Sequence, residues 1–513
     1  MKRNALHSDR PASSPGTPAR DQRQPIVGTL ARDVRRAIAW SSLSNLVLRV
    51  SSLAVGIVLA RLLSPEEFGI YAVALTVQTI LMTIADLGLS ADLIRSENPE
   101  RKAPTVATLG ITVGVLLTAG MMVTCQALAD SLGSPDAAGT IAVLAITLVL
   151  GGAGVVPYAM LQRRFAQKQL FAISVADFVV GTSITIGLVL LGWGVIGLAI
   201  GRVVAQSLTL LLQFVFARVR PKFGFDRSLV RQVLAFGLPI AGANLISWAL
   251  LNVDNVVISR IAGPTALGFY VLAFNISSWP MSAIGQVVRS ISLPLFARSV
   301  GKNKHTVLAD TTALAWAATL PAGAFLALLS APIIVVVYGP KWLPAAQVLA
   351  ALGMFGALRA LFDLFAAYLL ARGASRSVLW TQVIWVAALV PALIAATGWL
   401  GIVGAGWVHL AVAVVFVLPA YLIALHRTGI ELAGLARACW PPIAAMIPAS
   451  AAVLLVSTQS DAALWQFLLG GLSGGAVYLA LIYRWATRRI RAANSVQTTG
   501  SHREQSSVKE EQS

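Results

Sequence analysis

NVDNVVISRIAGPTALGFY, residues 252–270, places two asparagines and an aspartate within four positions of a strongly apolar chain. The second part of this stretch contains an arginine, a proline, a glycine and a tyrosine at fixed spacing, and RLLSPEEFGIY, residues 61–71, repeats them. The offset is 199 residues (260 minus 61), and Asn45 and Asn244 share it. Such matches indicate an internal duplication. The repeated residues are Arg61, Pro65, Gly69 and Tyr71 in the first copy, and Arg260, Pro264, Gly268 and Tyr270 in the second.

The composition is that of a membrane protein. Hydrophobic residues make up 57% of the 513 residues and charged residues 12%, and the mean hydropathy is +0.77. Soluble domains carry about 25% charged residues, so a soluble chain of this composition is not expected. The two cysteines lie far apart in apolar runs, which excludes a disulfide framework and predicts no metal site.

Apolar stretches of about 20 residues, the length that crosses a bilayer, recur along most of the chain. We expect an all-helical polytopic fold with fourteen transmembrane spans between two polar tails, residues 1–36 and 485–513, which are predicted to be disordered. The first tail has no signal-peptide pattern. The predicted spans are 37–60, 70–90, 103–127, 138–160, 170–191, 193–217, 231–258, 267–287, 310–337, 344–371, 378–398, 401–425, 438–457 and 463–484.

The basic residues alternate with this set of spans. Loops after even-numbered spans carry nineteen Lys and Arg residues, whereas loops after odd-numbered spans carry only Arg61, Arg260 and Lys341. The positive-inside rule therefore places the even loops and both termini in the cytoplasm. A wrong number of spans would scramble the alternation. The net charge of +18 then reflects topology, and a nucleic-acid partner is not expected.

Each copy of the repeat begins after a cytoplasmic segment and contains six spans, an even number. Equal orientation predicts a parallel repeat about an axis along the membrane normal. We expect an N-lobe over residues 37–230, a C-lobe over 231–425, and two further spans within 426–484.

The repeated motif is interpreted mainly as structural rather than as a direct ligand contact. Its arginines would end their helices on the outer side, where a guanidinium suits a helix C-terminus and reaches the interface. Its prolines suit a turn or the first position of the next helix. Its glycines would allow two helices to approach closely.

Polar side chains recur at helical spacing inside the spans around the motif, where contact with lipid would be costly. We expect the arginine and asparagines to face a wet cavity. The serines and threonines of spans 2 and 8 more simply form hydrogen bonds between helices. The cavity candidates are Asn45, Arg49, Asn244, Trp248, Asn252, Asn255, Asn275 and Gln286.

Each charged residue inside the spans could either serve transport or form an ion pair that stabilises the fold. Asp86 and Asp254 are candidates for ion coupling, although Asp86 could pair with Arg49, and Asp254 could pair within its own lobe. Arg202 and Arg359 are cavity candidates as well, yet Arg202 could pair with Asp177, and Arg359 with Asp363 four residues later. His409 stands alone on an apolar helix and is interpreted as a packing residue.

Sequence features of an enzyme are missing. No GxxxxGK[ST] phosphate loop occurs, and the loops hold no clustered set of His, Cys and carboxylate residues. No soluble domain or long outer loop is large enough for chemistry outside the membrane. We therefore expect neither catalysis nor a cofactor.

LARLLSPEEFGIYAVA (59–74), DNVVISRIAGPTALGFYVLAFNISSWP (254–280) and VVRSISLPLFARS (287–299) resemble polysaccharide-export flippases of the MOP superfamily, nearest the Wzx-like colanic-acid and teichuronic-acid exporters. The resemblance implies alternating access and a substrate made of an oligosaccharide on polyprenyl diphosphate, for exopolysaccharide, capsule or lipopolysaccharide biosynthesis. It also implies the bacterial cytoplasmic membrane and polymerase or assembly proteins as partners. Arg49, with Arg202 or Arg359, suits the diphosphate, and Asn, Gln, Trp and Tyr suit the sugars.

Three alternatives stay open. A multidrug exporter of the same superfamily predicts an acidic residue in span 1, where this chain has Arg49. A flippase for the peptidoglycan precursor, lipid II, shares the fourteen spans and a cationic cavity. A scaffolding protein would need partner motifs in the tails, and none is found.

Overall fold

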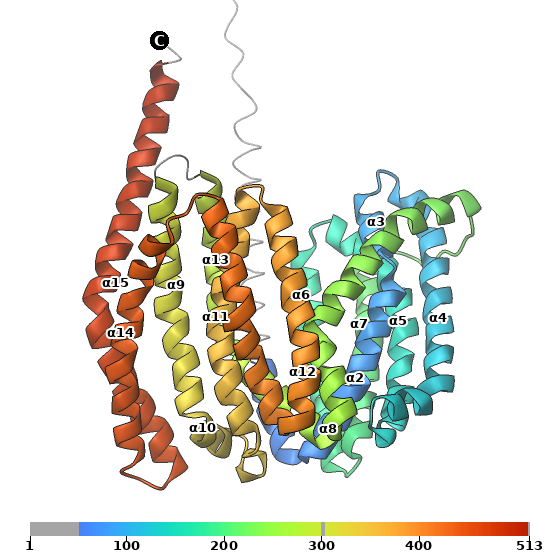
Figure 1. Ribbon diagram of the computed structural model, residues 1–513. Coiled ribbons are helices and arrows are strands. Elements are labelled where there is room, and N and C mark those ends of the chain that lie inside the picture. The colour runs from blue at the N-terminus through green and yellow to red at the C-terminus, as the bar shows by residue number, and fades with distance from the viewer. Residues whose placement is uncertain (1–50, 299–302, 511–513) are drawn as a thin grey trace, which may run out of the picture.

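The computed structural model describes residues 51–298 and 303–510, and every regular element in these ranges is helical. Twelve helices in these ranges are long and apolar enough to cross a membrane, which confirms the expected all-helical, polytopic fold (Figure 1). The first predicted span is described only as the helix Ser51–Leu62. The other helices are α2 Pro65–Asp86, α3 Leu89–Arg95, α4 Pro99–Ser131, α5 Ala138–Arg163, α6 Gln167–Leu190, α7 Gly194–Ala217, α8 Arg227–Arg298, α9 Asn303–Leu328, α10 Ser330–Val337, α11 Ala345–Ala371, α12 Ser375–Val412, a π-helical turn Ala413–Val417, α13 Leu418–Arg427, α14 Leu432–Ser457 and α15 Ala463–Glu510.

The first copy of the motif begins α2. Pro65 is the first helical residue, where its missing N–H costs nothing. Ser64 is the N-cap: its Oγ accepts a hydrogen bond from Glu67 N at 3.2 Å, and the Glu67 carboxylate accepts one from Ser64 N at 2.8 Å. This reciprocal capping box fixes where the helix starts.

The second copy turns the chain within α8. Gly263 has φ 84° and ψ 175°, a conformation that a side chain disfavours, and Pro264 follows it. α8 is therefore two helical segments joined at Gly263, in agreement with the predicted spans 231–258 and 267–287. At the start of α8, Ser228 donates hydrogen bonds from N and Oγ to Asp226, which lower the pKa of that carboxyl.

A similar break divides α12. Gly401 has φ 61°, so the chain turns there between the predicted spans 378–398 and 401–425. After His409 the α-helix loosens into the π-helical turn Ala413–Val417 before α13 begins. Such turns inside helices are frequent at functional sites.

Two groups of helices lie side by side in Figure 1. α4, α5 and α7 pack together in one group, and α9, α11, α14 and α15 pack together in the other. α2 packs on α8, and α8 packs in turn on α11 and α12, so the α2–α8 contact joins the groups. The assignment of lobes with a boundary near residue 230 stays a prediction.

Two predicted elements differ from the structure. The stretch 310–337 is not one helix: it breaks at Leu329 into α9 and α10, because Pro332 has no N–H to bond to the preceding turn. The predicted disordered tail 485–513 is helical as far as Glu510. No proline interrupts it, and Arg489 holds its first turns to α9 through an ion pair with Asp310 at 2.9 Å.

Candidate functional site

The structure describes only some of the predicted cavity residues. Asn45 and Arg49 lie outside the described residues, and so does the side chain of Gln286. Asn244 and Asn275 are exposed, and Trp248 is half-buried. The role of these residues in a cavity stays a prediction.

The two copies of the motif meet where α2 crosses α8. A Cβ atom added to Gly69 would lie 1.7 Å from Pro264 O, and one added to Gly268 would lie 2.0 Å from Pro65 O. Each copy therefore places its glycine against the proline carbonyl of the other copy. Only glycine allows this close approach of the two helices.

The asparagines of α8 lie just beyond this crossing. Asn255 Nδ2 donates to Thr76 Oγ1 on α2 at 3.4 Å, and Thr76 Oγ1 donates to Ala72 O at 2.8 Å. Asn252 Nδ2 donates to Trp248 O, one turn earlier in its own helix, at 3.0 Å. Both asparagines remain half-buried. Asn255 thus connects the two halves of the chain by a polar contact at the crossing.

Asp254, Tyr270 and His409 form a buried polar network, in which each residue is 6% exposed or less. Tyr270 Oη donates to Asp254 Oδ2 at 2.6 Å and lies 3.5 Å from His409 Nε2. His409 Nδ1 lies 2.7 Å from Ala405 O. Because a carbonyl only accepts, Nδ1 carries a proton and Nε2 is left facing the tyrosine.

The network places one donor between two acceptors. The Asp254 carboxylate and His409 Nε2 lie on either side of the Tyr270 phenol in a nearly dry site, where electrostatic interactions are strong. The assignment of Asp254 to ion coupling stays a prediction.

Sequence reasoning missed the network, because it interpreted His409 as a packing residue and Tyr270 as part of a structural motif. One signal was present: Asp254 and Tyr270 lie eight residues on either side of position 262, so a helical hairpin turning at Gly263 brings them together. At the offset of 199, Asp254 corresponds to Val55 and Tyr270 to Tyr71. At this position of the repeat, only the second copy therefore has a carboxylate.

Arg202 and Asp177 form the predicted pair, which is confirmed with an Nη1–Oδ2 distance of 3.7 Å between α7 and α6. Asp177 also accepts a hydrogen bond from Thr209 Oγ1 at 2.8 Å. Asp86 ends α2 and accepts one from Ser90 Oγ at 2.9 Å. The pairing of Arg359 with Asp363 stays a prediction.

The motif arginines cap helices other than those expected. Arg61 donates from Nη2 to Val336 O at 2.5 Å and from Nε to Val337 O at 2.8 Å, at the end of α10. Arg260 donates from Nη1 to Asp130 O at 3.2 Å and to Ser131 O at 2.5 Å, at the end of α4. Each arginine binds the open carbonyls of a helix from the other half of the chain. We call these the reciprocal arginine contacts.

Three proteins of known pathways are similar to this chain in sequence. The succinoglycan biosynthesis transport protein ExoT of Rhizobium meliloti (strain 1021) is 27% identical over 69% of this chain and 72% of its own. The teichuronic acid biosynthesis protein TuaB of Bacillus subtilis (strain 168) is 26% identical over 67% of this chain and 72% of its own. The lipopolysaccharide biosynthesis protein WzxC of Escherichia coli (strain K12) is 24% identical over 65% and 69%.

Solved transporters share the fold. The lipid II flippase MurJ, in an inward closed conformation, superposes with a TM-score of 0.71 at 15% identity, over 88% of this chain and 100% of that one. An inward-facing multidrug transporter of the MATE family gives 0.58 at 18% identity, over 77% and 99%. The family model for polysaccharide biosynthesis proteins matches residues 58–347, more than half of the chain. The chain is a member of this polysaccharide biosynthesis protein family.

Proposed function

We propose that this protein is a flippase that moves polyprenyl-diphosphate-linked oligosaccharide across the bacterial cytoplasmic membrane, and that it is not an enzyme. The observation that carries the proposal is the family match over residues 58–347, which covers both copies of the motif and the polar residues between them. The relatives that match are named for biosynthesis or transport of three different surface polysaccharides. A step that all three pathways could have in common is the transfer of a lipid-linked unit across the membrane.

The mechanism we propose is alternating access between an N-lobe over 37–230 and a C-lobe over 231–425, with both termini in the cytoplasm. The asymmetry of the basic loops supports this orientation. The crossing of α2 and α8 lies on the outer side in this topology, because Arg61 and Arg260 belong to outer loops. The reciprocal arginine contacts would then close the outer ends of the lobes, and must break when the site opens outward.

Arg49 is the residue we propose for the leading contact with the diphosphate, with the asparagines of α8 available to the sugars. A guanidinium inside the membrane needs an anionic partner, and a planar fork suits two phosphate oxygens. A polysaccharide polymerase or other assembly protein would be the partner that receives the exported unit.

For coupling we propose the network of Asp254, Tyr270 and His409. Its three members come from both segments of α8 and from α12, so a movement of one helix against the other changes their hydrogen bonds. A proton bound there would be linked to the position of the helices.

Deletion of the gene tests the function. Surface delivery of one polysaccharide should stop, and its lipid-linked unit should accumulate where only cytoplasmic reagents reach it, as measured in inside-out and right-side-out vesicles. Undiminished surface polymer in a strain with no second copy would contradict the proposal. Arrested peptidoglycan synthesis would favour a lipid II flippase, and drug sensitivity alone would favour a multidrug exporter.

A further inference from the structure

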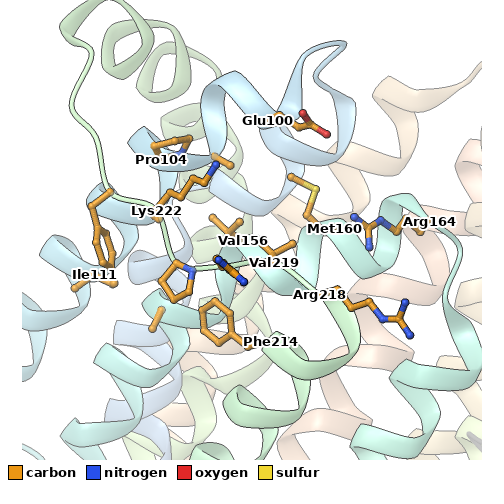
Figure 2. Close-up of a pocket in the computed structure, with 16 residues that line it drawn as sticks. Glu100, Pro104, Ile111, Val156, Met160, Arg164, Phe214, Arg218, Val219 and Lys222 are labelled. Carbon is orange, nitrogen blue, oxygen red and sulfur yellow. The ribbon is translucent and has the colours of Figure 1, made fainter.

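A pocket separate from the α2–α8 crossing opens at the cytoplasmic end of the first group of helices. Its volume is about 260 Å³, and it lies between the beginning of α4, the end of α5, the end of α7 and the segment 218–223 (Figure 2). These are the ends that the basic loops assign to the cytoplasm. Nothing in the proposed transport path uses this pocket.

The lining combines fixed cations with an apolar interior. Arg164, Arg218, Arg220 and Lys222 contribute four positive charges against the single carboxylate of Glu100, a net charge of +3. Arg164 Nη1 donates to Ala217 O at 2.8 Å. Among the described residues, the other three cations make no ion pair and no side-chain hydrogen bond.

Apolar side chains form the rest of the wall. Figure 2 shows Lys222 near Pro104 and Val156, and Ile111 and Phe214 also line the pocket. A ligand that fills this pocket therefore needs an anionic head and an apolar stem. A free anion would leave the apolar part unused.

The segment that closes the pocket is held in place before any ligand binds. It leaves α7 at Arg218, whose φ of 52° turns the chain sharply. Farther on, Gly224 N donates to Thr108 Oγ1 on α4 at 3.2 Å. A Cβ atom at Gly224 would lie 3.1 Å from Pro104 Cβ, so the segment rests directly on α4.

The same segment carries side chains typical of a membrane surface. Phe223 is 64% and Phe225 is 70% exposed, and the basic residues Arg220 and Lys222 precede them in the chain. Exposed aromatic rings beside cations enter the boundary between headgroups and acyl chains, where anionic lipids of the cytoplasmic leaflet concentrate. In the predicted topology, such side chains would place the mouth of the pocket near the lipid phosphates of the cytoplasmic leaflet.

We propose that this pocket binds the phosphate headgroup of a lipid of the cytoplasmic leaflet, with Arg220 and Lys222 on the phosphate, Arg218 adding positive charge at the rim, and the apolar wall on the first part of the acyl chain. A bound lipid would anchor the segment that joins α7 to α8. Because the site is outside the α2–α8 crossing, it stands or falls independently of the proposed function.

Lipid binding to the purified full-length protein in detergent tests the site. The variant Arg218→Gln/Arg220→Gln/Lys222→Gln should bind phosphatidylglycerol at least about tenfold more weakly, by native mass spectrometry with phosphatidylcholine as the neutral probe. The matched control Arg376→Gln/Arg427→Gln/Arg437→Gln removes three exposed cytoplasmic cations elsewhere and should bind as the wild type does. Equal losses in both variants would overturn the proposal, since general surface charge would explain them.

A second variant separates lipid from free anion. Ala107→Phe fills the apolar part and keeps every cation, so it should weaken binding of phosphatidylglycerol while leaving the melting temperature of the lipid-free protein near that of the wild type. Inorganic diphosphate should compete poorly in the wild type. Competition by inorganic diphosphate as strong as by lipid, together with unchanged lipid binding in Ala107→Phe, would overturn the lipid assignment. Preferential binding of undecaprenyl phosphate over phosphatidylglycerol would support it and identify a polyprenyl lipid, rather than a phospholipid, as the source.

Discussion

Gly69→Ala places one methyl group at the crossing of α2 and α8. The added Cβ would lie 1.7 Å from Pro264 O, whereas Cβ contacts below 3.0 Å essentially never occur. The two helices would therefore have to separate by at least 1.3 Å at this point (3.0 minus 1.7). Asn255 and Thr76 are already 3.4 Å apart, so a separation of this size would break their hydrogen bond.

The free-energy cost follows from these distances. Overpacking by one methyl group costs about 1–3 kcal/mol, and the higher helix propensity of alanine offsets about 0.5–1 kcal/mol of it. The net loss in stability of the closed crossing then lies between about 0 and 2.5 kcal/mol, and we expect the upper part of this range because the approach of 1.7 Å is to a backbone oxygen. Gly268→Ala should behave alike, because its Cβ would lie 2.0 Å from Pro65 O.

The matched control is Gly120→Ala in α4, where nothing lies within 4 Å of the added Cβ. Thermal melting in detergent, monitored by size-exclusion chromatography, should give a lower melting temperature for Gly69→Ala than for the wild type. For Gly120→Ala it should be unchanged or higher, because only the propensity of alanine acts there. Equal melting temperatures for Gly69→Ala and Gly120→Ala would refute the reasoning about the crossing.

Three further changes test other contacts. Tyr270→Phe removes the donor to Asp254 Oδ2, although the Asn255 N–H still donates to Oδ1, and should cost about 1–3 kcal/mol. Export assays should show a loss for Tyr270→Phe but not for Tyr71→Phe, because Val55 stands at the repeat position of Asp254. Arg260→Ala removes two hydrogen bonds to the end of α4, and should increase labelling of cysteines placed in the neighbouring outer loops; unchanged labelling would argue against an outer closure. In a chain lacking its two native cysteines, Arg220→Cys should react with an impermeant maleimide only from the cytoplasmic side, and labelling of intact cells would reject the topology.

Most of the fold could be predicted because it depends on short-range patterns. Hydropathy identifies the spans, and the basic loops fix their number. The turn at Gly263 falls between the predicted spans 231–258 and 267–287, where Pro264 was expected to suit a turn. The break between α9 and α10 was missed, because the apolar run continues through Pro332 and hydropathy alone does not register a lost backbone donor.

Contacts of the site could be predicted only where the two interacting residues lie on consecutive spans. Arg202 and Asp177 were paired correctly, because they lie on consecutive spans. His409 could not be assigned, since it joins α12 to a hairpin more than a hundred residues earlier, and a single sequence does not show which helices meet. The arginines of the motif were expected at their own helix ends, yet they cap α10 and α4, because the repeat brings each copy against the other half.

Transfer of a labelled substrate across a membrane tests the central claim most directly. The purified protein would be reconstituted into liposomes with a fluorescent oligosaccharide on polyprenyl diphosphate, and an impermeant quencher would measure the fraction in the outer leaflet over time. The account predicts that nearly all of the label becomes accessible in vesicles with the protein, while protein-free vesicles keep the inner fraction protected. The same protected fraction in both preparations would contradict it.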